Sequence, residues 1–291
     1  MTRAVADERH ILTSAGVAAP RLIYGTAWKK ERTAELVAQA LRAGFRGIDT
    51  ACQPKHYHEP GVGEALAVVA REGVLRSDIF LQTKFTPLRG QDPDSVPYDP
   101  GASIDQQVQQ SFAVSLRNLG QDALDKDALD SLILHSPYPE DSDTLEAWGA
   151  MERLFDQGLV RQLGISNCYE PERFERLWRA ARIKPAALQN RFHAKTQYDR
   201  VLRAFCRDKN IVYQSFWTLT ANPHILAAPA VTAIAGKYGR TPAQVFFRYL
   251  TQSGMACLTG TSSPEHMAQD LAIFDFCLTA REGEAIGAQL R

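Results

Sequence analysis

The sequence has few cysteines, no excess of charge of either sign and no long apolar run. Its five cysteines lie far apart, and an odd number does not suit a disulfide framework, which points to a reducing compartment. Lysine plus arginine equals aspartate plus glutamate at 33 each, so nothing favours nucleic acid or an anionic membrane as a partner. No apolar run reaches the roughly 20 residues that span a bilayer, and the first residues lack the apolar segment of a signal peptide. We therefore expect a cytoplasmic protein with a neutral or small-molecule partner.

What is present is a regular alternation of two kinds of segment. Hydrophobic residues make up 45% and charged residues 23% of the 291 residues, which suits a globular protein with a sizeable core. Apolar, β-rich stretches alternate with longer amphipathic stretches such as residues 31–44 and 146–158. The β-rich stretches are RLIYGTA, FRGIDTA, IFLQTKF, SLILHSP, VRQLGIS, AALQNRF, IVYQSFW and ACLTGT. Their number and order predict an α/β protein built as one (β/α)8 (TIM) barrel, a single domain over residues 1–291.

Two stretches interrupt this rhythm, residues 87–103 after the third predicted strand and residues 121–130 before the fourth. In a barrel, the loops that leave the C-terminal ends of the strands build the active face. Residues 87–103 should therefore overhang the site, and the acidic run 121–130 should lie at the opposite end as a solvated face.

Ionisable residues follow three successive predicted strands at the same position. Asp49 ends the second, Lys84 ends the third and His135 ends the fourth, while Tyr57 follows Asp49 in the same loop. The C-terminal strand ends of a barrel meet at one rim, where barrel enzymes hold their chemistry. We expect the Lys84 ammonium to lower the pKa of the Tyr57 phenol, Asp49 to pair with Lys84, and His135 to orient a polar substrate atom.

Each of these residue types also has a plainer explanation, because an aspartate can cap a turn, a lysine can lie along the surface, and a histidine or tyrosine can simply pack. The agreement of residue type and strand position four times over favours a shared site. His56 and His58 flank Tyr57, but no carboxylate or cysteine stands at ligand spacing from them. We therefore expect no metal.

The sequence resembles the aldo-keto reductase superfamily from LIYGTAW to SPEHMAQDL, nearly its whole length. The family's G-F-R-x-I-D-T-A, followed by Tyr and V-G-E-A-L, is matched by GFRGIDTA, Tyr57 and VGEAL; its strand-ending Lys is matched by Lys84 in LQTKF and its catalytic His by His135 in LILHSP. The resemblance implies a barrel that binds a nicotinamide cofactor without a Gly-rich Rossmann fingerprint. It also implies hydride transfer to an aldehyde or ketone, with Tyr57 as proton donor tuned by His135, Lys84 and Asp49.

The resemblance extends to residues that would hold the cofactor. The family's G-x-S-N matches GISN and its Gln matches Gln189 in LQNRF, so Ser166, Asn167 and Gln189 should bind the carboxamide. Aligning Leu219 with the family's Y-S-P-L places Phe216 on the nicotinamide, with Trp217 as the neighbouring alternative. The cofactor-binding residues implied are Thr26, Ser166, Asn167, Gln189, Phe216, Thr261, Ser262, His266, Gln269 and Asp270. The substrate pocket would include Trp28, His56 and His58, with a buried core position as the alternative for Trp28.

Two departures from the family pattern matter. Asp49 and Tyr57 are eight positions apart, a longer spacing than is usual in the family, so the loop must bulge to bring the phenol back to Lys84. If it does not, His56 or His58 would take over part of the acid role. After the eighth strand, Gly260 and His266 replace the family's Lys and Arg, the cations that grip the adenosine 2'-phosphate. Hydroxyls and a helix start could still bind a phosphate there, so we expect NADPH, with NADH as the alternative.

The remaining 20 residues, 272–291, predict a closing helix and not a long loop over the substrate, so the pocket should be open to a bulky carbonyl compound. We expect a monomer by family habit. Two other functions remain open: a redox-silent cofactor-binding regulatory protein, and a non-redox cyclase or isomerase that uses the same pocket. A metal hydrolase is the weakest candidate.

Overall fold

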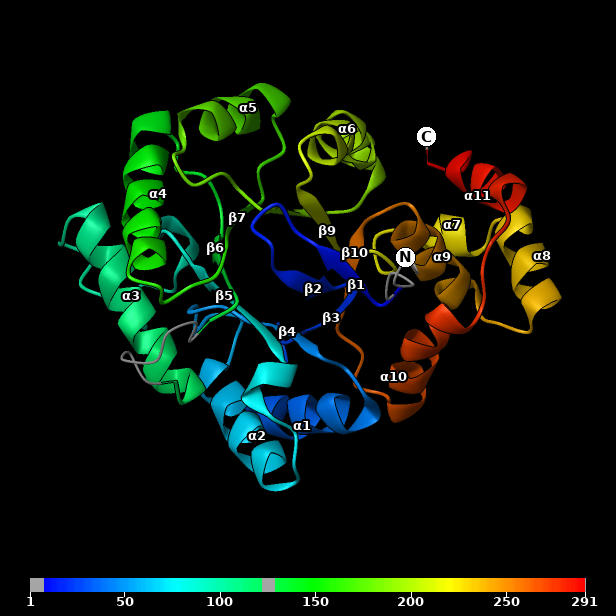
Figure 1. Ribbon diagram of the computed structural model, residues 1–291, viewed down its shortest axis with the longest axis horizontal. Helices are drawn as coiled ribbons and strands as arrows, with labels where there is room; N and C mark the ends of the chain where they lie inside the picture. The colour runs from blue at the N-terminus through cyan, green and yellow to red at the C-terminus, as the bar shows by residue number, and fades with distance from the viewer. Residues whose placement is uncertain (1–7, 122–128, 291) are drawn as a thin grey trace, which may run out of the picture.

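The computed structural model describes residues 8–121 and 129–290, and its centre is a closed barrel of parallel strands (Figure 1). The strands are hydrogen-bonded in the order β10-β3-β4-β5-β6-β7-β8-β9. Their bounds are β3 Leu22–Gly25, β4 Gly47–Asp49, β5 Phe80–Phe85, β6 Ser131–Leu134, β7 Leu163–Ser166, β8 Ala187–Arg191, β9 Val212–Phe216 and β10 Ala256–Thr259. Each strand lies within one of the eight predicted stretches, so the expected (β/α)8 barrel is confirmed.

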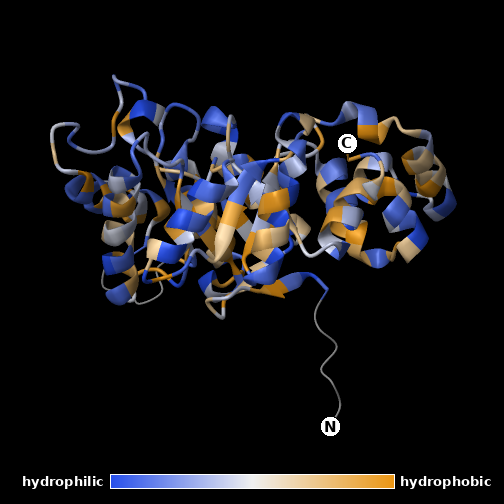
Figure 2. Ribbon diagram, turned by 90° about the horizontal axis from the view of Figure 1, so that it is seen from above, coloured by the Kyte–Doolittle hydropathy of each residue, from blue (hydrophilic) through white to orange (hydrophobic). Residues whose placement is uncertain are grey.

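Helices surround the barrel and cover the outer faces of its strands (Figure 1). They are α1 Thr33–Ala43, α2 Glu59–Arg71, α3 Ile104–Leu119, α4 Asp141–Asp156, α5 Pro171–Ala180, α6 Arg200–Asp208, α7 Pro223–Leu226, α8 Pro229–Tyr238, α9 Pro242–Gln252, α10 Pro264–Leu271 and α11 Ala280–Gly287. Short 3₁₀ turns are η1 Lys30–Arg32, η2 Arg76–Asp78, η3 Leu88–Gly90, η4 Ala194–Asp199 and η5 Ala272–Asp275. Helices α7, α8, α9 and α11 gather at one side of the barrel, where Figure 2 shows them as a mainly helical lobe.

Helix starts and ends follow local chemistry. Ser103 begins α3 with a capping box, in which its side chain accepts from the backbone of Gln106 while the Gln106 side chain accepts from the backbone of Ser103. Thr241 begins α9 in the same way. Gly44 ends α1 in the left-handed region, at a φ of 116°, which a residue with a side chain would adopt only with strain.

A two-stranded hairpin that we did not expect closes the N-terminal end of the barrel. Strands β1 (His10–Leu12) and β2 (Ala18–Pro20) pair antiparallel, and Figure 1 shows them lying across that end. Val17 and Ala19 pack against residues near the starts of the barrel strands, among them Ile23 and Phe80. The turn at Gly16, with a φ of 76°, was the signal that the sequence offered. The hairpin therefore covers this end of the barrel, and the C-terminal strand ends form the opposite mouth.

Three expectations about loops and termini have different outcomes. A closing helix is present as expected, but it occupies only part of residues 272–291: η5 ends at Asp275, and α11 begins at Ala280 with a capping box between Thr279 and Glu282. Residues 87–103 pack on the loop between β4 and α2, where Gly90 accepts a hydrogen bond from Gln53. Residues 122–128 of the acidic run lie outside the described residues. Among residues 8–121 and 129–290, no helix is long and apolar enough to cross a membrane.

Candidate active site

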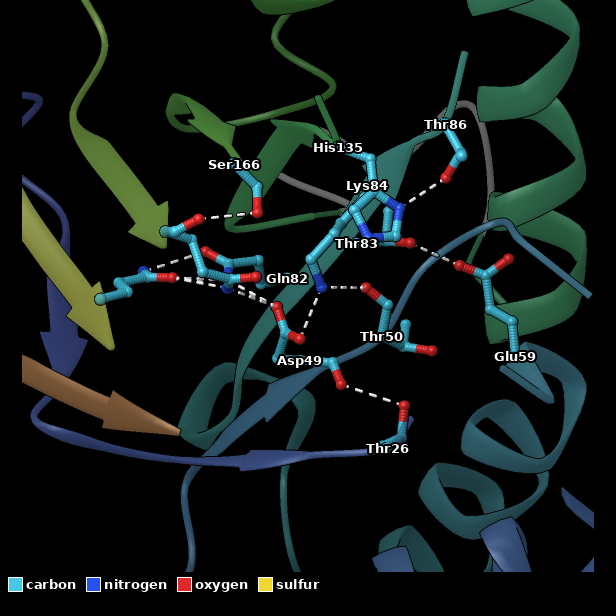
Figure 3. Close-up of polar contacts among 12 residues, drawn as sticks. Thr26, Asp49, Thr50, Glu59, Gln82, Thr83, Lys84, Thr86, His135 and Ser166 are labelled. Carbon is cyan, nitrogen blue, oxygen red and sulfur yellow. Dashed lines mark hydrogen bonds and ion pairs between the residues drawn. The ribbon is translucent and has the colours of Figure 1, made fainter. Parts of the chain in front are cut away.

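A buried ion pair lies inside the C-terminal mouth of the barrel (Figure 3). Lys84 Nζ lies 2.5 Å from Asp49 Oδ2, and the two side chains are 1% and 3% exposed. Lys84 also donates to the backbone oxygen of Thr50 at 2.8 Å. Thr26, predicted to bind the cofactor, is buried and donates its hydroxyl to the backbone oxygen of Asp49 at 3.0 Å. The second and third strand ends thus meet as expected from their positions in the sequence.

Three buried glutamines support this pair from within the barrel. Asp49 Oδ1 accepts from Gln82 Nε2 at 2.7 Å and from Gln189 Nε2 at 3.0 Å. Gln214 Oε1 accepts from the same two amides, each at 2.9 Å. Both Asp49 oxygens are therefore bonded, which a buried carboxylate requires. Gln82 and Gln214 were missed from the sequence, although Gln82 stands two residues before Lys84 and so must share its inward face of β5.

The long loop before α2 returns the phenol to the ion pair. A turn in which Gln53 O accepts from the backbone N–H groups of His56 and Tyr57 shortens the path. Lys84 Nζ then lies 5.2 Å from the centroid of the Tyr57 ring. The rings of Tyr57 and His135 meet edge to face, with centroids 5.9 Å apart. Asp49, Tyr57, Lys84 and His135 therefore lie together at one mouth.

The pKa shifts in this cluster differ from our expectation in one respect. Burial raises the pKa of the Tyr57 phenol, and the charge of Asp49 raises it further. The Lys84 ammonium, 5.2 Å from the ring centroid, does not offset these two effects, so the expected lowering of the Tyr57 pKa is wrong. Burial also lowers the pKa of Lys84, against the pull of Asp49. At neutral pH the mouth therefore contains a protonated phenol.

His135 is held as a neutral imidazole. Burial is the main cause that places its pKa well below the usual value, and the charge of Lys84 lowers it further. Its Nδ1 lies 2.6 Å from Thr86 Oγ1, one residue beyond the end of β5. When Thr86 donates to Nδ1, Nε2 carries the proton and can donate to a substrate oxygen.

The residues predicted to bind a carboxamide lie at the ends of β7 and β8, although the side-chain amide of Gln189 is bonded to Asp49 and Gln214. Ser166 Oγ donates to Gln189 O at 2.7 Å, and Asn167 Nδ2 donates to Ser166 Oγ at 3.2 Å and to His135 O at 2.9 Å. Asn167 has a left-handed backbone, with a φ of 53°. Asparagine adopts this region more readily than most residues, and the turn keeps the Asn167 amide beside Ser166 and the backbone of His135.

Aromatic side chains form the exposed rim. Trp28 is 60% exposed, so the alternative of a buried core position is wrong, and its ring lies 4.0 Å from that of half-buried His56. His58 is exposed just before α2. Phe216 ends β9, and exposed Trp217 follows with a φ of 57°. The guanidinium of Arg191, a residue that we did not predict, lies 4.1 Å from the Trp217 ring and 5.9 Å from that of Phe216. Both aromatics therefore remain candidates for stacking on a planar ligand.

Hydroxyl groups lie at the start of α10, and a lysine from another loop lies close to them. Ser263 caps the helix by accepting from the backbone N–H of His266, and Thr261 Oγ1 accepts from Ser263 N. The Lys29 ammonium donates a hydrogen bond to the backbone oxygen of Gly260. Within the described chain, Lys29 has no carboxylate at ion-pair distance. Lys29, which sequence reasoning missed, thus brings a positive charge to the strand end that lacks the family's lysine.

The remaining predicted residues near α10 differ in accessibility. His266 and Ser262 are exposed, and Gln269 is half-buried with its amide bonded to Glu265 at 3.1 Å. Asp270 is buried and accepts from Thr259 Oγ1 at 2.7 Å. Burial raises the pKa of Asp270 to about 6. Among the residues that the structure describes, no group of three or more His, Cys, Asp or Glu side chains could hold a metal ion.

These features define a (β/α)8-barrel protein with a cluster of ionisable side chains at the C-terminal strand ends, the position that barrel enzymes use. The model of the Aldo/keto reductase family matches residues 21–290. An aldo-keto reductase of Mycolicibacterium smegmatis is 33% identical over 89% of this chain and 84% of its own length. A probable NAD(P)H-dependent D-xylose reductase of Arthroderma otae is 30% identical over 94% of this chain and 89% of its own. A crystal structure of an aldo/keto reductase from Brucella melitensis superposes with a TM-score of 0.79 at 28% identity, covering 97% of this chain and 99% of that one.

The chain therefore belongs to the aldo/keto reductase family and is an NAD(P)H-dependent oxidoreductase of carbonyl chemistry. The recognition made from GFRGIDTA, LQTKF and LILHSP is confirmed.

Proposed function

We propose that this protein reduces an aldehyde or ketone, with Tyr57 as the proton donor. The observation that carries the proposal is the meeting of Tyr57 with Lys84 and His135 at the barrel mouth, despite the long loop between Asp49 and Tyr57. A bound nicotinamide would supply the hydride. The phenol, whose pKa is raised by burial, keeps its proton at neutral pH and can give it to the oxygen of the reduced carbonyl.

The neighbours of Tyr57 have separate roles in this proposal. The Lys84 ammonium, fixed by Asp49, stabilises the phenolate that remains once the proton has left. His135, neutral and held by Thr86, donates from Nε2 to the carbonyl oxygen and so orients it toward the phenol. Exposed Trp28 and half-buried His56 would contact the substrate at the rim and favour a bulky or apolar carbonyl compound.

We also propose that NADPH is the preferred cofactor. Ser166 and Asn167 would hold its carboxamide, and Phe216 or Trp217 would stack on its ring. At the other end, Thr261, Ser262 and the start of α10 offer hydroxyl and backbone N–H donors to the 2'-phosphate. The Lys29 ammonium at Gly260 supplies a cation where the residue at position 260 cannot. Asp270 and Gln269 lie further along α10, where the adenine end of the cofactor would contact the protein.

The test is consumption of NADPH with a panel of aliphatic, aromatic and sugar aldehydes, D-xylose included, in parallel with cofactor binding measured by tryptophan fluorescence. We expect turnover with at least one class and tighter binding of NADPH than of NADH. Tyr57→Phe should lower kcat by about 100-fold or more, while the Kd for NADPH stays within twofold.

Two results would contradict the proposal. Tight NADPH binding without reduction of any panel member would favour a redox-silent binding protein. Full activity in Tyr57→Phe would remove the phenol from the chemistry and leave His56 or His135 as the acid.

A further inference from the structure

Glu59 is a buried carboxylate that the proposed reaction does not use. It is the first residue of α2, two positions after Tyr57, and it is 2% exposed. Burial raises the pKa of its carboxyl, and hydrogen bonds from Thr83, Asn118 and Ser115 act in the opposite direction. A buried acid is costly unless it is well bonded, and an apolar side chain could fill the same space without that cost.

The hydrogen bonds of Glu59 join three elements of the fold. Thr83 Oγ1 on β5 donates to Glu59 Oε1 at 2.5 Å, and Ser115 Oγ on α3 donates to the same oxygen at 3.1 Å. Asn118 Nδ2, also on α3, donates to Oε2 at 3.1 Å. Figure 3 shows Glu59 facing Thr83 on the outer side of β5, whereas Lys84 points into the barrel. The carboxylate therefore ties the start of α2 to the strand that carries Lys84.

Helix α2 packs closely on α3 beside this carboxylate. A Cβ atom at Gly63 would lie only 2.1 Å from the backbone oxygen of Asn118, so the glycine allows α2 to touch the end of α3. That contact brings Asn118 within reach of Glu59 one turn earlier on α2. The carboxylate is thus bonded to β5 through Thr83 and to α3 through Ser115 and Asn118.

We propose that Glu59 is a positioning residue for Tyr57, which holds the phenol against Lys84 by tying the start of α2 to β5. The Glu59–Thr83 hydrogen bond joins a residue two positions after Tyr57 to the residue next to Lys84. The bulged loop before Tyr57 is thereby fastened at its C-terminal end to β5, the strand that carries Lys84. The inference rests on the proposed function, because a role in catalysis requires that Tyr57 act in the reaction.

Two variants test the tie, and a third is a matched control. Thr83→Val removes the hydroxyl donor and keeps the Glu59 charge, while Glu59→Gln keeps the side-chain length, removes the charge and replaces one acceptor oxygen by an amide nitrogen. Asp130→Asn removes another buried carboxylate, which accepts from Leu81 N at 2.9 Å near the opposite end of β5. The readouts are kcat and the KM for NADPH, together with hydrogen exchange of residues 50–58 followed by mass spectrometry.

We expect both Glu59-site variants to lower kcat about tenfold, since misplacement of a reacting group by a fraction of an ångström has this order of effect. The KM for NADPH should stay within twofold, and residues 50–58 should exchange about tenfold faster. Asp130→Asn should lose stability without either change. Thr83→Val, the milder change, decides the matter if Glu59→Gln does not fold.

Wild-type kcat and unchanged exchange in a folded variant would overturn the proposal. An equal loss of kcat in Asp130→Asn would do the same, because it would show a general effect of stability. If the wild-type protein reduces no carbonyl compound, the proposed function fails by itself. Faster exchange in the two Glu59-site variants alone would then still support the tie, and unchanged exchange would refute it.

Discussion

Removal of the Asp49 charge should destabilise the fold, and the loss of stability should grow as the pH falls. In Asp49→Asn, Lys84 keeps the backbone oxygen of Thr50 as an acceptor but loses the carboxylate that compensates its charge. Loss of one partner from a buried pair costs about 3 to 5 kcal/mol. We expect a value near 3 kcal/mol, because the new amide oxygen can still accept a hydrogen bond. The melting temperature should fall by roughly 10 °C.

The pH dependence follows from the pKa of Lys84, which burial lowers and Asp49 raises. Without Asp49 the pKa of folded Lys84 falls further below the value of about 10.4 in the unfolded chain. Over the pH range between these values the unfolded state binds one more proton, so stability is lost at up to about 1.4 kcal/mol for each unit by which the pH falls. The difference in the free energy of unfolding between wild type and variant should therefore grow as the pH falls from about 9 to about 7.

Urea unfolding of wild-type and variant protein at several pH values measures this difference. Asp130→Asn is again the control, because the partners of Asp130 are Arg76 and Arg161, whose guanidinium groups stay charged throughout this range. Its cost should not vary with pH. If the cost of Asp49→Asn were equally flat, Lys84 would not be the group that responds to the loss of the carboxylate, and the electrostatic account of the mouth would be refuted.

Three further predictions concern other parts of the structure. Lys29→Met should weaken NADPH binding about tenfold and NADH binding less than threefold in a fluorescence titration, because a cation near a 2'-phosphate is lost; equal weakening would contradict this role. Asp270→Asn should stabilise the protein more at pH 8 than at pH 5, and its gain in free energy of unfolding should differ by about 1 to 2 kcal/mol between the two. The reason is that the folded protein with an acid of pKa about 6 loses stability as the pH rises through that value. A gain that is the same at both pH values in urea unfolding would count against this. Gly63→Ala should cost about 2 kcal/mol in thermal unfolding by its clash with Asn118, whereas Gly236→Ala, in open space on α8, should not destabilise.

The barrel, and the residues that meet at its mouth, could be predicted because both depend on the positions of the strands. Asp49 and Lys84 lie at strand ends, and parallel strands bring such ends together whatever the details of packing. The shape of the loop to Tyr57 could not be predicted, because it depends on a turn at Gln53 and on contacts with Gly90 from a distant loop. The hairpin at Gly16 was missed because its strands have only three residues each.

The sign of the pKa shift at Tyr57 was beyond sequence reasoning for a different reason. A sequence shows that a lysine stands near a tyrosine, but the shift depends on how deeply the phenol is buried and on the nearby charge of Asp49. Lys29 shows the same limit at the cofactor end. The sequence indicates only that position 260 lacks a lysine, while the fold brings one there from another loop.

Strand β5 links the residues of the active site with a residue of the outer layer of the barrel. Gln82 and Lys84 point into the barrel and bond to Asp49, while Thr83 between them points outward and bonds to Glu59. Side chains alternate along a strand, so a shift of β5 by one residue would exchange these faces and break both sets of contacts at once. The inward pair and the outward tie therefore specify the same register, and the hydrogen bonds of Glu59 oppose the slip that would remove Lys84 from the mouth. On this reasoning the outer layer of the barrel stabilises the alignment on which the proposed chemistry depends.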